Sequence, residues 1–209
     1  MWALIIAISI SGVIAPFFFP SDFYEGSMRY FSDPFFDQLL RLQQSPLSDA
    51  SHRLIGIALL VLGMIQFNED IRRTRPRLHR WTGRLYMVLA TIVVVTAMDL
   101  VVQYAFGGFV EMVGIGLISF AFAFFVILGF IKIREKDFAG RRESMMRGFG
   151  ILMFVTVQRP FFIIMSSVSN FEVVINFLWA GGFALATTTL ITEWWIRHTQ
   201  RTDKPDATV

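Results

Sequence analysis

Long apolar runs recur along this chain, and two of them contain a charged residue near the middle. Asp99 lies within the run at 82–106, and Arg159 lies within the run at 145–168. Each run exceeds the ~20 apolar residues that a helix needs to cross a bilayer. An ionisable side chain at such a depth is costly unless it is paired or faces a polar cavity. The pattern therefore predicts a membrane-spanning protein with a polar interior, in which Asp99 and Arg159 are candidate functional residues.

The composition excludes several other classes of protein. Hydrophobic residues make up 55% of the chain and charged residues only 17%, whereas a soluble domain is closer to a quarter charged. The absence of cysteine excludes disulfides, thiol chemistry and iron–sulfur ligation. The net charge of +3 comes from short basic blocks between apolar segments, which are typical of topology signals rather than of a DNA-binding face. We expect the lipid bilayer as the partner, and no nucleic acid.

The apolar runs predict an all-α fold, a polytopic transmembrane helical bundle that forms a single membrane domain over residues 1–209. We expect six spans, at residues 2–19, 51–67, 82–106, 110–133, 145–168 and 171–196. The first could be a signal peptide, but it lacks a basic n-region and an A-x-A cleavage site, so we expect residues 1–20 to be retained as a span or anchor. Residues 21–50 then form an external loop, 51–197 the helical bundle core and 198–209 a cytoplasmic tail.

Charge placement predicts the orientation of the bundle. Three segments are densely basic, namely 72–80, 132–147 and the tail from Arg197. Such segments stay in the cytoplasm under the positive-inside rule, and six spans put all three on that side. We therefore expect a multi-pass protein of the cell membrane with both termini cytoplasmic.

The external loop contains a helix signal of its own. Asp33-Pro34 is a typical helix start, and apolar residues follow it at helical spacing up to Gln43. This pattern predicts a short amphipathic external helix on the outer interface. The helix either covers the bundle or acts as a mobile lid.

Depth along the helices places several polar residues at one level. At 1.5 Å per residue, Asp99 lies about 22 Å beyond Arg84, and Arg159 lies about 18 Å beyond Arg147. Both spans run from inside to outside, so we expect the two charges to pair in the outer half. The alternative to a ligand site is a structural ion pair that only fixes helix register. The candidate substrate-binding or proton site comprises Asp99, Arg159, His52, Arg53, Gln103 and Gln158.

Pro160 adds a backbone feature directly after Arg159. Proline has no backbone N–H and frees the carbonyl four residues earlier, at Thr156. We expect a kink in the fifth span at this point.

A second group of candidates begins the third span. The string His79-Arg80-Trp81-Thr82-Gly83 repeats the pattern of His52-Arg53-Leu54-Ile55-Gly56 at the opposite face. Glycine at such positions permits close helix approach. We expect the arginines of this region to cluster at the inner rim, where they either bind an anionic lipid head group or serve only as orientation signals. The inner-rim motif comprises His79, Arg80, Gly83, Arg84, Tyr86 and Arg147.

These residues resemble a known family. A span that His52 opens and Gln66-Phe67 ends, followed by a basic loop and the string from His79 to Tyr86, is similar to the bacterial membrane proteins called domain of unknown function 2306. The resemblance extends over roughly 50–195 and includes Arg141-Arg142, Met145-Met146-Arg147 and Arg159. The chain departs from the family pattern of His and Trp by having Arg141 and Ser144. The resemblance implies the fold and topology, and its name implies no activity. The positions that it singles out are His52, His79, Arg80, Gly83, Arg84, Tyr86, Arg147 and Arg159.

Three classes of function remain open. The first is a protein that binds or transports a small molecule or proton, in which Arg159 engages an anionic or carbonyl group and Asp99 or His52 handles a proton. The second is an intramembrane enzyme acting on a lipid or isoprenoid, with Asp99 as general acid and aromatic faces stabilising a cation. The third is a haem electron carrier, which needs two histidines at one depth, whereas His52 is predicted outside and His79 inside.

The chain contains no motif that would decide between these classes. No P-loop, His-Glu-x-x-His, nucleophile elbow or carboxylate-rich metal cluster is present in the sequence. We expect no cofactor and no metal site, and the sequence does not decide whether the protein is an enzyme.

Overall fold

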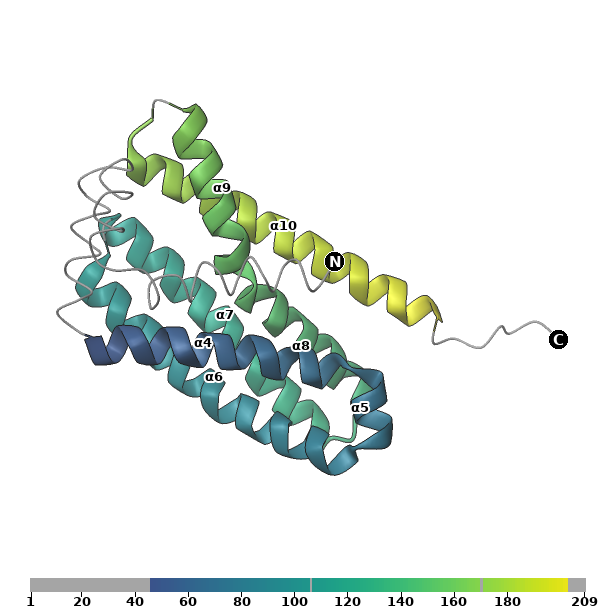
Figure 1. Cartoon of the computed structure of the whole chain (residues 1–209). Coiled ribbons are helices and arrows are strands. Elements are labelled where there is room, and N and C mark those ends of the chain that lie inside the picture. The colour runs from purple at the N-terminus through teal and green to yellow at the C-terminus, as the bar shows by residue number, and fades with distance from the viewer. Residues whose placement is uncertain (1–45, 106, 170, 203–209) are drawn as a thin grey trace.

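The computed structural model describes residues 46–105, 107–169 and 171–202, and it is built of helices within these ranges (Figure 1). The predicted first span at 2–19 and the predicted external helix at 33–43 lie outside the described residues. The helices are α4 (Pro46–Phe67), α5 (Glu69–Thr74), α6 (Pro76–Tyr104), α7 (Gly108–Arg134), α8 (Phe138–Leu152), α9 (Phe154–Val168) and α10 (Val173–Thr202).

Four helices of the described part are long and apolar enough to cross a membrane. They are α4, α6, α7 and α10, which correspond to the predicted spans at 51–67, 82–106, 110–133 and 171–196. The all-α membrane bundle is therefore confirmed, and four of the five spans predicted within the described residues are single helices of sufficient length. The segment predicted as one continuous span at 145–168 instead forms two helices, α8 and α9. Each has 15 residues, and neither alone is long enough to cross a bilayer.

The boundary between α8 and α9 lies at Met153, and Figure 1 shows a change of direction there. Backbone hydrogen bonding continues through it, because the Met153 amide donates to Phe149 and the Val157 amide donates to Met153. Pro160 lies inside α9, and the kink expected there stays a prediction.

The connections at one end of the bundle are fixed by local caps. Asn68 caps α5, because its side chain accepts a hydrogen bond from the Ile71 amide at 3.0 Å. Lys136 follows α7 in the left-handed conformation, with φ 60°, and this turn lets the Asp137 amide donate to Lys132 at 2.9 Å. Asp137 then caps α8 by accepting from the Gly140 amide at 2.8 Å. This hydrogen bond, with the nearby Lys132 ammonium, holds the pKa of the Asp137 carboxyl below its usual value.

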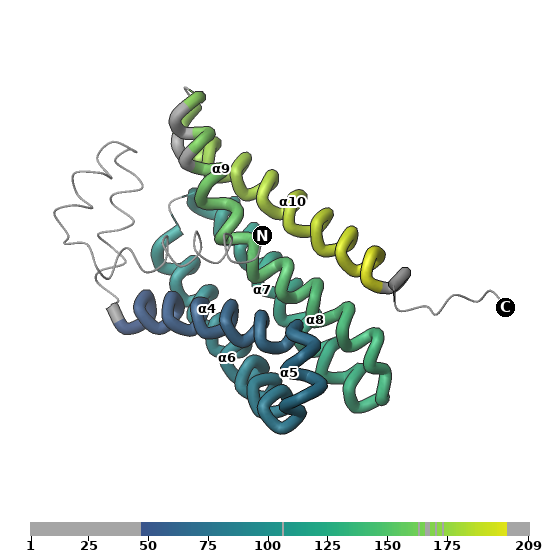
Figure 2. The backbone as a smooth tube through the Cα atoms, turned by 45° about the vertical axis from the view of Figure 1, so that its right-hand side comes forward, coloured from purple at the N-terminus to yellow at the C-terminus, as the bar shows by residue number. Residues whose placement is uncertain are grey.

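The helices pack in an order that follows the chain. α4 lies against α6, α6 against α7 and α7 against α8, while α10 runs along α9 and α8 (Figure 2). We call the end formed by residues 68–84 and 132–142 the basic end, because it carries the two internal arginine-rich segments. The opposite end, formed by residues 46–53 and 96–111, is called the far end. Figure 1 shows α5 and the start of α6 at the basic end, away from the start of α4.

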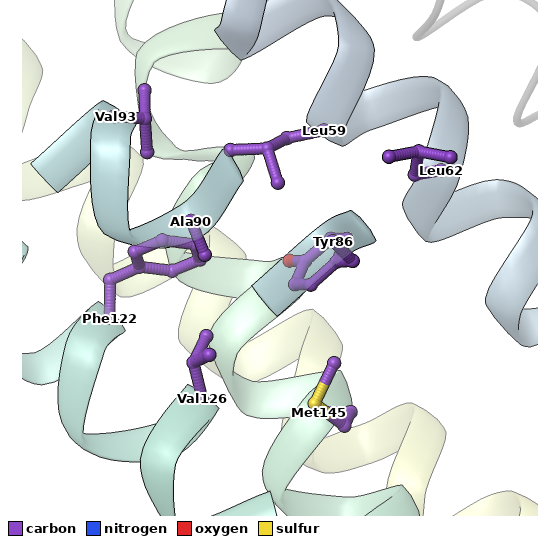
Figure 3. Packing of buried hydrophobic residues seen from close by; sticks show 8 residues of the cluster. All are labelled: Leu59, Leu62, Tyr86, Ala90, Val93, Phe122, Val126 and Met145. Atoms are coloured by element: carbon purple, nitrogen blue, oxygen red, sulfur yellow. The ribbon is translucent and has the colours of Figure 1, made fainter. Parts of the chain in front are cut away.

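A buried apolar layer fills the bundle between its two ends. Leu59 of α4 is fully buried, and it lies with residues of α6 and α7 in one cluster (Figure 3). We call this cluster the apolar layer and define it by five of its residues, namely Leu59, Ala90, Val93, Phe122 and Val126. Side chains from three helices interlock here, so the layer contributes to stability by hydrophobic burial and close packing.

Close helix approach also depends on glycine at two sites. A Cβ on Gly150 of α8 would collide with the Thr192 side chain of α10, and a Cβ on Gly63 of α4 would collide with the Phe149 ring. At Gly56, by contrast, a Cβ would have no neighbour within 4 Å among the described residues outside the nearby backbone of α4 itself. Gly150 and Gly63 are thus required by packing, and Gly56 is not.

The outside of the bundle is apolar. On α7, Phe109 is 74% exposed and Phe120 is 70% exposed, and further exposed apolar residues continue the same stripe towards Ile131. A monomeric soluble protein rarely exposes so large an apolar surface. This surface fits contact with lipid chains.

Candidate functional site

The far end gathers ionisable residues from four helices. At its centre, Asp49 and Arg53 of α4 form an ion pair one helical turn apart, with Arg53 Nη2 2.7 Å from Asp49 Oδ2 and Arg53 Nε donating to Asp49 Oδ1 at 2.8 Å. Both side chains are about four-fifths buried, at 20% and 22% exposed. A two-bond contact of this kind is among the stronger protein ion pairs.

Arg159 of α9 lies in the electrostatic field of this pair. The charges that act on its guanidinium are those of Arg53, Glu111 and Asp49. Among the described residues, Arg159 makes no hydrogen bond and no ion pair within 4.0 Å. Its side chain is also exposed at the surface of the chain. Arg159 therefore lies in the field of other charges, but it forms no hydrogen bond or ion pair with any of these charged residues.

The predicted ion pair between Asp99 and Arg159 is wrong. Asp99 instead accepts a hydrogen bond from the Ser48 hydroxyl at 2.7 Å and one from Gln103 Nε2 at 2.6 Å. The reason is the packing order of the helices, because α6 turns Asp99 towards α4, while α9 packs mainly on α10. The two charges thus belong to the same end of the bundle without contacting each other.

Three further polar residues belong to the far end. His52 Nδ1 lies 3.0 Å from Thr96 Oγ1, one helical turn from the Ser48–Asp99 contact. Glu111 is only 7% exposed, and it accepts from the Gly107 amide at 2.7 Å, so it caps the start of α7. Gln158 is buried beside Arg159, and its Nε2 has no hydrogen-bond partner.

The basic end holds a second polar group around the start of α6. Gln66 of α4 donates from Nε2 to the His79 carbonyl at 2.9 Å and to the Thr82 hydroxyl at 2.6 Å. A Cβ added to Gly83 would lie 3.1 Å from Gln66 Oε1 and 3.6 Å from Arg141 Nη2. Gly83 therefore lets side chains of α4 and α8 approach the backbone of α6.

Two buried atoms near this group have no hydrogen-bond partner, His79 Nδ1 and the Tyr86 hydroxyl. Tyr86 is 1% exposed, and Figure 3 shows its ring among the apolar residues of the core. A buried hydroxyl without a partner costs free energy.

The inner-rim arginines do not form one unpaired cluster. Arg147 pairs with Glu193 of α10, with Nε 2.6 Å from Oε1 and Nη2 3.2 Å from Oε2, and it also lies 3.4 Å from Glu143. Arg84 stays exposed on α6, with its guanidinium carbon 5.6 Å from the centre of the Trp81 ring, and Arg80 is exposed. Arg147 is therefore paired with acids of α8 and α10, and the expected clustering of these arginines at the inner rim stays a prediction.

The positions of the histidines bear on a haem site. His52 contacts Thr96 at the far end, whereas His79 begins α6 at the basic end. These two residues cannot ligate one haem. Within the described ranges, no group of three or more His, Asp and Glu side chains gathers to hold a metal ion.

Sequence reasoning missed Asp49, Glu111 and Arg141 as members of these groups. The spacing of Asp49 and Arg53, four residues apart on a helix, was a signal for their pair. Glu111 lies next to the Gly107-Gly108 turn, where an acid four residues after the first glycine can cap the next helix. Arg141 had no such signal, because its neighbours come from α4 and α6.

Comparison with known proteins agrees with this description. The family model for predicted membrane proteins called domain of unknown function 2306 (DUF2306) matches residues 50–196, well over half of the chain. No curated protein and no solved structure matches the chain. With its apolar helices and this match, the chain is a membrane protein that belongs to the DUF2306 family.

Proposed function

We propose that this membrane protein binds a small anionic molecule, such as a carboxylate, at the far end and moves it across the membrane. The observation that supports this is the state of Arg159. It is an arginine in a largely apolar helix, it makes no hydrogen bond or ion pair with the described residues, and it is accessible. Intramembrane charges are usually paired or functional, and the guanidinium fork matches a carboxylate.

The acids near Arg159 are held by other contacts. Asp49 contacts Arg53, and Glu111 accepts a hydrogen bond from the Gly107 amide, so neither carboxylate contacts the Arg159 guanidinium. The guanidinium is therefore open to an anionic ligand. Gln158 is adjacent to Arg159 in the chain, and its Nε2 is buried and has no hydrogen-bond partner. This amide is a further hydrogen-bond donor in the same part of α9.

Groups that can exchange a proton lie at the same end. Asp99 holds its carboxylate through the Ser48 hydroxyl and the Gln103 amide, and His52 contacts a hydroxyl of α6. Both side chains are half-buried, so protonation of either would change the charge of the far end. A proton taken up with the anion would reduce the charge that has to cross the apolar layer.

The test measures the melting temperature of the full chain in detergent. Tryptophan fluorescence monitors the unfolding. The probes are acetate, benzoate and succinate as sodium salts, each compared with sodium chloride at equal ionic strength. A ligand that binds only the folded state stabilises it by about 2.7 kcal/mol at a hundredfold excess over its Kd. We expect at least one carboxylate to raise the melting temperature beyond the effect of chloride.

The matched substitutions are Arg159→Gln and Arg197→Gln. Arg197 is an exposed arginine of α10, so its loss removes the same charge away from the site. We expect Arg197→Gln to keep the response and Arg159→Gln to lose it, while Arg159→Lys, which keeps the charge, covers the case in which Arg159→Gln does not fold. The proposal fails if chloride stabilises the protein as well as every carboxylate does, or if Arg159→Gln responds like the parent chain.

A further inference from the structure

A cation without a partner also lies at the basic end, on α8. Arg141 is half-buried, and its guanidinium makes no hydrogen bond or ion pair with any residue that the structure describes. The acids nearest to it in the chain are engaged elsewhere. Asp137 pairs with Lys132 at 3.2 Å and caps α8, and Glu143 contacts Arg147.

The surroundings of Arg141 are positive. The charges that act on the His79 ring come from Arg141 and Arg72, and no acid is among them. His79 Nδ1 is buried and has no hydrogen-bond partner. A half-buried guanidinium and an unpartnered imidazole nitrogen thus lie close together, with no negative charge between them.

The backbone of α6 lies close to Arg141 at the same place. Gly83 is buried, and a Cβ there would be 3.1 Å from Gln66 Oε1 and 3.6 Å from Arg141 Nη2, so the absence of a side chain lets both groups approach α6. The Gln66 amide is held in place by its bonds to His79 and Thr82. These contacts fix the side of the site that faces α4.

We propose that Arg141 and His79, beside Gly83, form a binding site for a phosphate group at the basic end of the bundle. An arginine fork binds two phosphate oxygens at once, and a histidine N–H adds a third donor. The site is separate from the far-end cluster, because the apolar layer lies between them. The phosphate belongs either to a lipid head group or to a soluble phosphate compound, since both present the same oxygens.

The experiment uses the purified full chain in a neutral detergent. Two probes are added separately, inorganic phosphate and phosphatidylglycerol in mixed micelles, with chloride at equal ionic strength and phosphatidylcholine as their references. The melting temperature reports binding, and native mass spectrometry reports lipid that stays bound. We expect one or both probes to stabilise the parent chain above its reference, and a phosphatidylglycerol adduct wherever the lipid is the effective probe.

The matched variants are Arg141→Gln and Arg77→Gln. Arg77 is an exposed arginine in the first turn of α6 at the same end, and it lies outside the proposed site. We expect Arg77→Gln to respond like the parent chain. In Arg141→Gln, the probe concentration for half-maximal stabilisation should rise by about tenfold or more, since a tenfold change corresponds to ~1.4 kcal/mol. Arg141→Lys serves the same purpose if Arg141→Gln does not fold, because it keeps the charge and loses the fork.

The outcomes separate the two sources of phosphate. An effect of phosphatidylglycerol without an effect of inorganic phosphate assigns the site to a lipid head group, and the reverse assigns it to a soluble phosphate. The proposal is overturned if neither probe stabilises the parent chain above its reference. It is also overturned if Arg77→Gln loses the response as strongly as the Arg141 variants, because general attraction to a basic surface would then be sufficient.

Discussion

Single charges at the far end differ in what holds them. Asp49 and Arg53 satisfy each other, Asp99 is satisfied by neutral donors, and Arg159 has only the field of its neighbours. Removal of Asp49 would therefore leave Arg53 without its ion-pair partner and in the repulsive field of Arg159. Removal of Asp99 would leave only a hydroxyl and an amide without an acceptor.

Double-mutant cycles distinguish these cases. In the cycle of Asp49→Asn with Arg53→Gln, we expect a coupling energy of about 1–3 kcal/mol, because the two side chains share two contacts. In the cycle of Asp99→Asn with Arg159→Gln, we expect additivity within about 0.5 kcal/mol, because these side chains do not touch. The measurement is the free energy of unfolding in detergent. Strong coupling of Asp99 to Arg159 would mean that the two do pair in the folded protein.

The sequence led to the residues of the far end more readily than to their contacts. Helical rise alone identified the common end of His52, Asp99 and Arg159, because depth depends only on position along each helix. Their partners depend on how each helix is rotated and on which helix lies beside it. Ser48 and Thr96 could therefore be identified as the partners of Asp99 and His52 only from the structure, in which α4 packs against α6.

At the scale of helices, the interface of α8 with α10 combines a close contact and an ion pair. Gly150 lets the Thr192 side chain approach the α8 backbone, and Arg147 bonds to Glu193 one residue further along α10. The small residue sets the distance between the helices, and the ion pair fixes their register. A change at Gly150 should therefore disturb both.

We expect Gly150→Ala to lower the free energy of unfolding by about 1–3 kcal/mol, the usual range for overpacking a filled interface. Gly56→Ala is the control, because a Cβ there meets no atom and alanine favours a helix over glycine by about 1 kcal/mol. The two variants should shift the melting temperature in opposite directions. Equal and small effects of both would show that α8 and α10 are further apart than the structure has them.

Where a single helix is long enough to cross the membrane, the length of its apolar run was sufficient to predict it. The segments that became α4, α6, α7 and α10 each carry an unbroken apolar run with a turn signal or a basic block beside it. The segment 145–168 is less uniformly apolar, and it divides at Met153. Gly148 and Gly150 precede this boundary and Pro160 follows it, but none of these residues stands at the boundary itself.

At the scale of the whole molecule, the positive residues are distributed by end. The α5–α6 region and the α7–α8 connection carry the internal arginine-rich segments, and Figure 1 shows them on the same side of the bundle. Under the positive-inside rule we expect this side to face the cytoplasm. The far end, with its buried Glu111 and Asp49, is then expected to face the opposite compartment.

Reporter fusions test this orientation directly. We expect reporters joined after Arg77, Lys136 and Lys204 all to show a cytoplasmic location. The three basic segments share one side if α8 and α9 together cross the membrane once before α10 crosses back. A reporter in the Gly107-Gly108 turn should show the opposite location. A single fusion on the wrong side would contradict the orientation.

The apolar layer has an electrical consequence. It contains no charged side chain, and it separates the ionic far end from the basic end. In a membrane that carries a voltage, the potential therefore falls mainly across this layer, where the dielectric constant is lowest. Moving one elementary charge through a 100 mV potential changes its free energy by about 2.3 kcal/mol. Any net charge carried from one end to the other must cross most of that field, so its transport produces an electric current.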